Sequence, residues 1–494
     1  MLGDLKTLGK DTLVYGLSTV AARLLNFLLL PFYTHFLAPG EYGIVAIVFT
    51  YIAFANAVFQ YGMDQAYLRF AANQPPAKTD ACFSTAQWSL LASAAAFAAL
   101  LILGAAPVAR LTALRPGDAA LIRYAALILA LDAITIVPFA ELRLRRRKWA
   151  FVGIKFFHIV INVLGNIFFL GVLKMGVEGV LIAALFASSA SLVLLAPVCA
   201  LRLRACFDFK LYRELLRFGL PFIPAGIGAM MVQVIDRPIL QHLTDEATVG
   251  IYQANYRLGI FMMLIVTMFD QAWRPFFLEK AKDEDAKPVF ARVLTYFLTA
   301  SVLIVAALSL FIGDIVRLPL GGVSLIHPAY WSGLPVVPVV LAAYILHGAY
   351  INFMTSVTLT KRTELLIWVT FLGAAVNIAA NFLLIPLLGM MGAAWATFAS
   401  YTAMALCLYL IGRRIYPIPY EYARLFHLLV ITAVMLAAVC AARGAFAGTN
   451  AAAWFAARLG ALALLPALLL ATGFFTAAER RALASLPRRL LRLV

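Results

Sequence analysis

The chain has 494 residues, of which 64% are hydrophobic and only 13% are charged, whereas soluble domains are about 45–50% apolar and about 25% charged. This composition excludes a soluble globular protein and predicts a polytopic membrane protein. The net charge of +17 does not indicate a nucleic-acid partner, because the basic residues cluster in short segments between long apolar runs.

Fourteen apolar runs are long enough to cross a bilayer as helices, which takes roughly 20 residues. Six runs precede a basic segment near residue 205, six follow it, and a last pair ends the chain. We therefore predict an all-α membrane protein with two six-helix lobes, 1–205 and 206–415, and a C-terminal helix pair with a basic tail, 416–494. The runs lie at about 13–37, 42–63, 83–107, 119–141, 149–171, 178–200, 217–241, 249–272, 292–313, 334–359, 364–386, 391–412, 424–442 and 452–475.

Positive charge marks the orientation of these runs. Most of the 40 Lys and Arg residues fall in alternate connecting segments, such as 143–148 and 413–424, and they share one side of the membrane with both termini. Because cytoplasmic loops carry an excess of Lys and Arg, both termini are predicted to be cytoplasmic.

A few charges lie within the runs. Arg23 is near the middle of the first run, where a charge costs at least about 2.5–3.5 kcal/mol and usually faces a polar cavity. The alternative is snorkelling or a packing role. Further basic side chains make the interior cationic, so an anion is the expected ligand, although Lys155 is close enough to a helix end to snorkel. The other members of this set are Arg237, Arg257 and Lys155, partly offset by Asp132 and Asp236.

Asp236 directly precedes Arg237. On a regular helix the two side chains point about 100° apart, so Asp236 need not neutralise Arg237. The same run, 217–241, contains Pro221, Pro224, Gly226, Gly228 and Pro238. Since proline removes a backbone donor and clashes with the preceding turn, this run is predicted to be bent or broken and to act as a hinge.

The two halves repeat at an offset of about 207 residues: His35 matches His242 and Gly43 matches Gly250. Six runs per half preserve direction, which predicts parallel repeats around an axis along the membrane normal, with a central site between them. Arg23 has no basic counterpart, since Met230 takes its place. This mismatch favours an asymmetric cargo.

Two stretches carry a family resemblance: NIAANFLLIPLLGMMGAAWATFASY at 377–401, and residues 37–44 followed by YGMDQAYLRF at 61–70. They resemble the polysaccharide transporter family of O-antigen and exopolysaccharide flippases, in the superfamily that also holds lipid II flippases and MATE multidrug transporters. The resemblance implies a monomer in the bacterial inner membrane that moves an undecaprenyl-diphosphate-linked oligosaccharide to the outer leaflet by alternating access, for surface polysaccharide biosynthesis. It also implies partners in the same pathway, a glycan polymerase and glycosyltransferases.

The diphosphate is expected to bind the basic set Arg23, Arg237, Arg257 and Lys155, since arginine suits phosphate through bidentate hydrogen bonds. No organic cofactor or metal is expected, but the resemblance to lipid II flippases leaves a coupling Na⁺ or H⁺ open, alongside helix packing as the alternative role. The candidate cation or polar-cavity residues are Asp236, Asn377, Asn381, Thr397, Asp132, Asn26 and Gln233.

Three alternatives stay open at this point: a lipid II flippase, a MATE-type antiporter, and a membrane polymerase or ligase acting on the same glycan. A MATE-type antiporter would need acidic residues in the first run, which has Arg23 instead. An enzyme would need a catalytic motif, and the only formal one, Asp283-Glu284-Asp285, lies in a solvated charge run. We therefore expect a transporter, not an enzyme.

Overall fold

The computed structural model describes residues 27–112, 114, 116–320, 322–445, 451–477 and 479–481. In these ranges twelve helices are long and apolar enough to cross a membrane, or up to thirteen if a bent pair forms one span. The predicted first run lies mostly outside the described residues, apart from the helical segment Phe27–Phe36. The prediction of an all-α polytopic membrane fold is confirmed.

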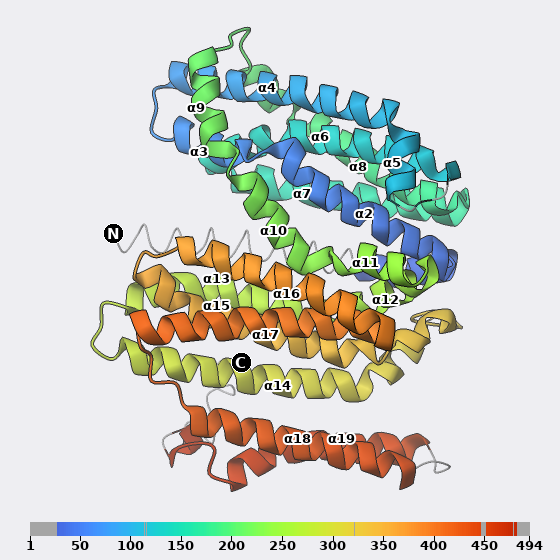
Figure 1. The fold of residues 1–494 in the computed structure, drawn as a ribbon, viewed down its shortest axis with the longest axis vertical. Coiled ribbons are helices and arrows are strands. Elements are labelled where there is room, and N and C mark those ends of the chain that lie inside the picture. Colours follow the sequence, from blue (N-terminus) through green and yellow to red (C-terminus); the bar gives the residue numbers. More distant parts are fainter. Residues whose placement is uncertain are drawn as a thin grey trace.

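The first half of the chain forms the bundle at the top of Figure 1. Its central helices pack in the series α4, α6, α8 and α7, and α2 packs on α6. Tyr61 and Gly62 both adopt positive φ (33° and 67°) and so end α2, as the sequence predicts for a run finishing near 63. The elements are α2 (Pro39–Gln60), α3 (Met63–Ala71), α4 (Pro76–Leu103), α5 (Ala105–Leu111), η1 (Pro116–Asp118), α6 (Ala119–Leu144), α7 (Lys148–Asn166), the π-helical η2 (Ile167–Val172) and α8 (Gly176–Arg202).

The predicted seventh run is three helices: α9 (Phe209–Gly219), α10 (Phe222–Val234) and α11 (Asp236–Leu243). The break in this run is therefore confirmed, with interruptions at 220–221 and at Ile235. α9 packs on α3 and α4 of the first half, whereas α10 and α11 pack on both α2 and α16. This run thus joins the two halves, and its action as a hinge stays a prediction, as do the domain boundaries.

The second half forms the lower bundle of Figure 1. Its tightest packing is among α15, α16 and α17, where the Ser400 hydroxyl donates to the Gly373 carbonyl at 2.7 Å. Small residues allow such close approach of membrane helices. The elements are α12 (Glu246–Leu258), α13 (Ile260–Lys280), α14 (Ala286–Arg317), β1 (Pro319–Leu320), β2 (Val323–Ser324), η3 (Pro328–Gly333), α15 (Val336–Leu359), α16 (Glu364–Leu388) and α17 (Met390–Ile415).

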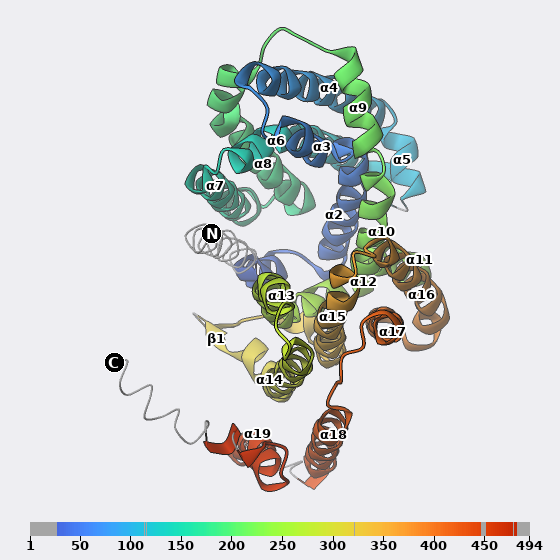
Figure 2. The ribbon, with the colours of Figure 1, turned by 90° about the vertical axis from the view of Figure 1, so that its left-hand side faces the viewer.

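The C-terminal pair, α18 (Tyr422–Ala445) and α19 (Ala451–Ala471), stands apart from both bundles in Figures 1 and 2 and packs mainly on α14. Two polar links hold it there. Arg458 pairs with Asp314 of α14 at 2.5 Å. Glu479, just after α19, pairs with Arg424 of α18 at 3.0 Å and accepts a hydrogen bond from Tyr296 of α14.

The carboxylate of Glu479 makes this link sensitive to acid. Burial alone would raise its pKa, but the Tyr296 hydroxyl, the Thr476 N–H and the Arg424 charge outweigh burial and lower the pKa to about 2. Because this pKa is lower in the folded protein than the unfolded value of 4.5, the ionised carboxylate stabilises the fold above pH 4.5. That stabilisation is lost as the pH falls toward 2. We expect Glu479→Gln to lower the melting temperature at pH 6, and the deficit to vanish near pH 2.

Differential scanning fluorimetry of purified protein measures this deficit. The control is Glu364→Gln, which changes an exposed carboxylate at the start of α16. A Glu479→Gln deficit that stays constant from pH 6 to pH 2 would contradict the assignment.

The two bundles meet where α2 and α12 begin. A Cβ on Gly43 would lie 1.8 Å from the Glu246 carbonyl oxygen, and a Cβ on Gly250 would lie 1.9 Å from the Pro39 carbonyl oxygen. Both helices therefore approach at backbone distance, which only glycine permits at these positions. Gly43 and Gly250 are the glycines that match each other in the sequence repeat, and each lies against the helix that carries the other.

A short segment of the second half closes over the same end. After the β1–β2 hairpin, the Tyr330 hydroxyl donates to the Leu37 carbonyl at 2.9 Å, and the His327 and His35 rings are 5.6 Å apart. The Lys- and Arg-rich connections, such as that between α6 and α7, lie at the other end of the bundles in Figure 1, which we call the basic end. The halves are thus in contact at the end opposite the basic end.

Candidate functional site

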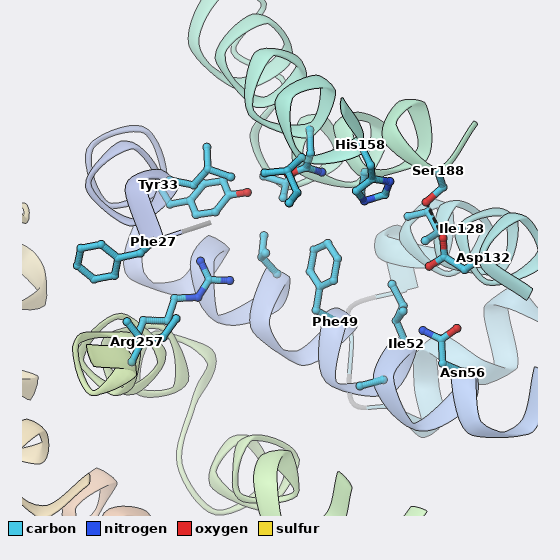
Figure 3. Close-up of a pocket in the computed structure, with 18 residues that line it drawn as sticks. Phe27, Tyr33, Phe49, Ile52, Asn56, Ile128, Asp132, His158, Ser188 and Arg257 are labelled. Carbon is cyan, nitrogen blue, oxygen red and sulfur yellow. Dashed lines mark hydrogen bonds between the residues drawn. The ribbon is translucent and has the colours of Figure 1, made fainter. Parts of the chain in front are cut away.

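A cavity of about 520 Å³, which we call the inter-bundle cavity, is lined mostly by the first half and, from the second half, by Arg257 and Ile260. Figure 3 shows Tyr33, Phe49 and His158 around it, with Arg257 reaching in from the second half. Its size is in the usual range of about 300–1,000 Å³ for ligand pockets. The lining residues are Phe27, Leu29, Tyr33, Val45, Phe49, Ile52, Ala53, Asn56, Ile128, Asp132, His158, Ile159, Asn162, Val180, Ala184, Ser188, Arg257 and Ile260.

Arg257 owes its position to the bend between α12 and α13. The two helices meet at 47° around Gly259, where a Cβ would lie 2.7 Å from Val340 Cγ1. The Arg257 guanidinium lies 5.8 Å from the ring centres of both Tyr33 and Tyr42. No carboxylate of the described residues forms an ion pair with it. Arg257 thus brings an uncompensated positive charge to the cavity wall.

Arg237 is placed differently, since it is only 4% exposed. Its guanidinium donates to Asp236 Oδ1 at 2.6 Å and to Gln253 Oε1 at 3.0 Å, and Tyr252 donates to the other Asp236 oxygen at 2.5 Å. Asp236 therefore does neutralise Arg237, and the geometry of a regular helix does not hold here. The helix is interrupted at Ile235, and the long arginine side chain folds back toward the preceding turn, where it also donates to the Gln233 carbonyl.

The two arginines nevertheless connect a series of cavities. Arg257 and Arg237 both line a cavity of about 120 Å³ between α2 and α10–α12. Arg237 also lines a cavity of about 480 Å³ inside the second half. In this series, Arg257 lines both the inter-bundle cavity and the small cavity, and the neutralised Arg237 lines both the small cavity and the cavity of the second half.

The remaining basic residues of the predicted set do not join this series in the described part of the chain. Lys155 places its ammonium 4.2 Å from the Phe139 ring centre, away from the walls of the three cavities. Arg23 and Asn26 lie outside the described residues. The predicted binding of a diphosphate by the basic set stays a prediction.

The candidate cation residues fall into three places. Asp132 lines the inter-bundle cavity and accepts a hydrogen bond from Ser188 at 2.8 Å. Gln233 lines the cavity of the second half. Asn381 donates to the Asn377 side chain at 2.9 Å, and Thr397 donates to its own helix at Ala393. The last three are buried in the packing of α16 and α17, and both oxygens of Asp236 are engaged as described.

Sequence reasoning missed His158, Ser188 and the tyrosines that line the two large cavities. His158 hydrogen-bonds through Nδ1 to Ser191 at 3.0 Å, opposite Asp132 in the cavity wall (Figure 3). A single polar residue on an apolar helix gives no recognisable spacing pattern in the sequence, because the residue that it contacts lies on another helix. Only the fold brings them together.

Comparison with known families decides the assignment. Residues 33–322, more than half of the chain, match the family described as "Polysaccharide biosynthesis protein". The chain belongs to this polysaccharide biosynthesis family. No curated protein matches the chain.

Solved structures share the fold of this polysaccharide biosynthesis family member. The lipid II flippase MurJ in an inward closed conformation has a TM-score of 0.75 at 13% identity, covering 94% of this chain and 98% of that chain. An inward-facing multidrug resistance MATE family transporter of the MOP superfamily has a TM-score of 0.65 at 15% identity, covering 79% and 94%. An outward-facing MATE transporter has a lower TM-score of 0.55 at 13% identity, covering 82% and 95%. These TM-scores show a common fold, and at identities this low they show the fold alone.

Proposed function

We propose that the protein is a flippase that moves an undecaprenyl-diphosphate-linked oligosaccharide from the cytoplasmic to the outer leaflet of a bacterial inner membrane, for surface polysaccharide biosynthesis. One observation carries the proposal: Arg257 brings to the inter-bundle cavity a charge that no carboxylate of the described residues pairs with. Arg257 is half-buried, and a cation partly removed from water without a partner is costly, so an anionic ligand would stabilise it. The family and the fold shared with a lipid II flippase support the same class of cargo.

The diphosphate is the part of such a substrate that Arg257 would hold. A guanidinium binds phosphate oxygens through two parallel hydrogen bonds, and the aromatic rings of Tyr33 and Tyr42 lie beside the Arg257 guanidinium. The prenyl tail would remain in the lipid, as hydrocarbon does. In this proposal Arg257 recognises the lipid carrier, whichever glycan it bears.

Alternating access follows from the contact between the halves. The Gly43–Gly250 contact closes the end opposite the basic end, and the positive-inside rule assigns the basic end to the cytoplasm. The state described here would then load from the cytoplasmic leaflet. Release would require the glycine contact to open, with α10 and α11 as the connection that bends.

The membrane potential is a sufficient energy source in this scheme. Moving two negative charges outward across 100 mV, inside negative, releases about 4.6 kcal/mol. A coupling Na⁺ or H⁺ would add to this, and Asp132 is the candidate that faces the large cavity. We propose that the potential drives the loaded step and that Asp132 is the position at which any coupling cation acts.

Liposomes containing the purified protein and fluorescent undecaprenyl-diphosphate-N-acetylglucosamine test the function. With a potential negative at the basic end, we expect the lipid to move to the opposite leaflet, where an impermeant reductant quenches it. Protein-free liposomes and a reversed potential are the controls. Lipid II in place of the probe distinguishes the two flippase activities.

Equal quenching with and without protein would contradict the proposed function. Faster movement of lipid II than of the N-acetylglucosamine lipid would assign the protein to peptidoglycan precursors instead. Growth of the glycan chain on the probe would identify an enzyme. We propose that the protein acts as a monomer that receives substrate from glycosyltransferases and delivers it to a polymerase.

A further inference from the structure

The cavity of about 480 Å³ in the second half is separate from the diphosphate site and has two unlike walls. One wall is aromatic and comes from α15, α17 and the end of α12. The other is polar and comes from α10 and α13. The residues that line it are Gln233, Val234, Arg237, Tyr256, Met263, Val266, Thr267, Asp270, Arg274, Tyr344, His347, Tyr350, Ile351, Met354 and Tyr401.

The aromatic wall is built of nearly parallel rings. His347 lies between Tyr350 and Tyr401, with ring centres 6.1 and 4.8 Å away and interplanar angles of 17° and 29°. Tyr350 and His347 are half-buried, so they present ring surface to the cavity. Tyr344 extends this wall and donates to the Tyr256 hydroxyl at 3.3 Å.

The polar wall offers both donors and acceptors. Gln233 is exposed, and Thr267 is half-buried. Asp270 and Arg274 pair with each other at 2.7 Å one helical turn apart, and each keeps further hydrogen-bonding capacity, because a carboxylate accepts about four bonds and a guanidinium donates five.

The charges of this cavity are balanced, in contrast to those of the inter-bundle cavity. Arg237 is neutralised by Asp236 and Arg274 by Asp270, and no lining residue of the described chain carries an unpaired charge. An anion would gain less electrostatic stabilisation in this cavity than beside Arg257. A neutral ligand with one apolar face and several hydroxyl groups fits both walls.

We propose that this cavity binds sugar rings of the translocated glycan. A pyranose ring presents C–H groups on its face, which pack on aromatic rings, and hydroxyl groups at its edge, which hydrogen-bond to amide, carboxylate and guanidinium groups. The smaller cavity shares a lining residue with each of the two sites, Arg257 with the diphosphate site and Arg237 with this one. The inference rests on the proposed function and adds a second site, which binds the sugar part of the substrate.

The test compares two probes by native mass spectrometry: undecaprenyl diphosphate and undecaprenyl-diphosphate-N-acetylglucosamine. Wild type should bind the sugar-bearing lipid more tightly. Tyr350→Ala should weaken binding of that lipid about three- to tenfold, the value of one aromatic contact, without changing the Kd of the bare diphosphate. Tyr350→Phe keeps the ring and should bind like wild type.

Tyr409→Ala is the matched control, because it removes a tyrosine of α17 that lies outside this cavity. Equal affinity of wild type for both lipids would overturn the sugar site while leaving the flippase proposal intact. Equal weakening of both lipids by Tyr350→Ala would show a packing role and overturn it as well. Tight binding of tetraphenylphosphonium that Tyr350→Ala abolishes would assign the cavity to organic cations. Binding of neither lipid by wild type would contradict the proposed function and this inference together.

Discussion

Arg257→Ala is expected to weaken binding of undecaprenyl diphosphate about ten- to hundredfold and to abolish its translocation, while the protein still folds. Hydrogen bonds to a charged group contribute about 1.5–3 kcal/mol, and each 1.4 kcal/mol is a factor of ten in affinity. Folding should persist because no carboxylate of the described residues pairs with Arg257. Lysine at this position should restore binding only in part, since an ammonium lacks the bidentate fork.

Arg237→Ala provides the contrast. It would leave Asp236, which is 2% exposed, as a buried unpaired charge, and such a change costs about 3–5 kcal/mol. We expect this variant to accumulate poorly in membranes, whereas Arg257→Ala accumulates normally. Binding by native mass spectrometry and quantification of membrane protein measure both outcomes. Normal transport by Arg257→Ala at wild-type abundance would contradict the diphosphate site.

Gly43→Val is expected to prevent closure at the end opposite the basic end and so to stop transport. Its Cβ alone would collide with the Glu246 carbonyl, and relief requires α2 and α12 to separate. The measurement is cross-linking by a bifunctional thiol reagent with a short spacer between His35→Cys and His327→Cys, whose native rings are 5.6 Å apart, in a chain whose five natural cysteines are replaced. The two cysteines should cross-link to each other when residue 43 is glycine and should fail to do so when it is valine.

Gly40→Ala is the matched control, because it adds a Cβ to the same helix where nothing lies within 4 Å. Should Gly43→Val not accumulate, Gly250→Ala tests the same contact from the other helix with a smaller side chain. Efficient cross-linking in either glycine variant would show that the contact is dispensable for closure.

The helices could be predicted from the sequence because apolar length alone identifies a membrane span. The predicted run 334–359, for example, is the helix Val336–Leu359. The break around Pro221 could be predicted for a similar reason, since proline acts on its own helix. These features depend on residues that are neighbours in the chain.

Side-chain partners across helices could not be predicted in this way. The pairing of Arg237 with Asp236 was not predicted, because the argument assumed a regular helix and the helix is interrupted at Ile235. Tyr256, Tyr350 and Tyr401 come from three helices far apart in the sequence, so their shared cavity has no sequence pattern. The sequence repeat, in contrast, located Gly43 and Gly250 as equivalent positions without indicating that they touch.

The contact between Gly43 and Gly250 is reciprocal: each glycine faces the carbonyl of the residue four positions before the other. In a symmetric dimer such an interface is isologous, and a residue on the two-fold axis meets its own copy. A half-length chain that dimerised in parallel would have formed the same contact with a single glycine. Fusion of two such chains would free each copy to change alone, so that one bundle could acquire Arg257 and the paired Arg237 while the axis between them kept its original geometry.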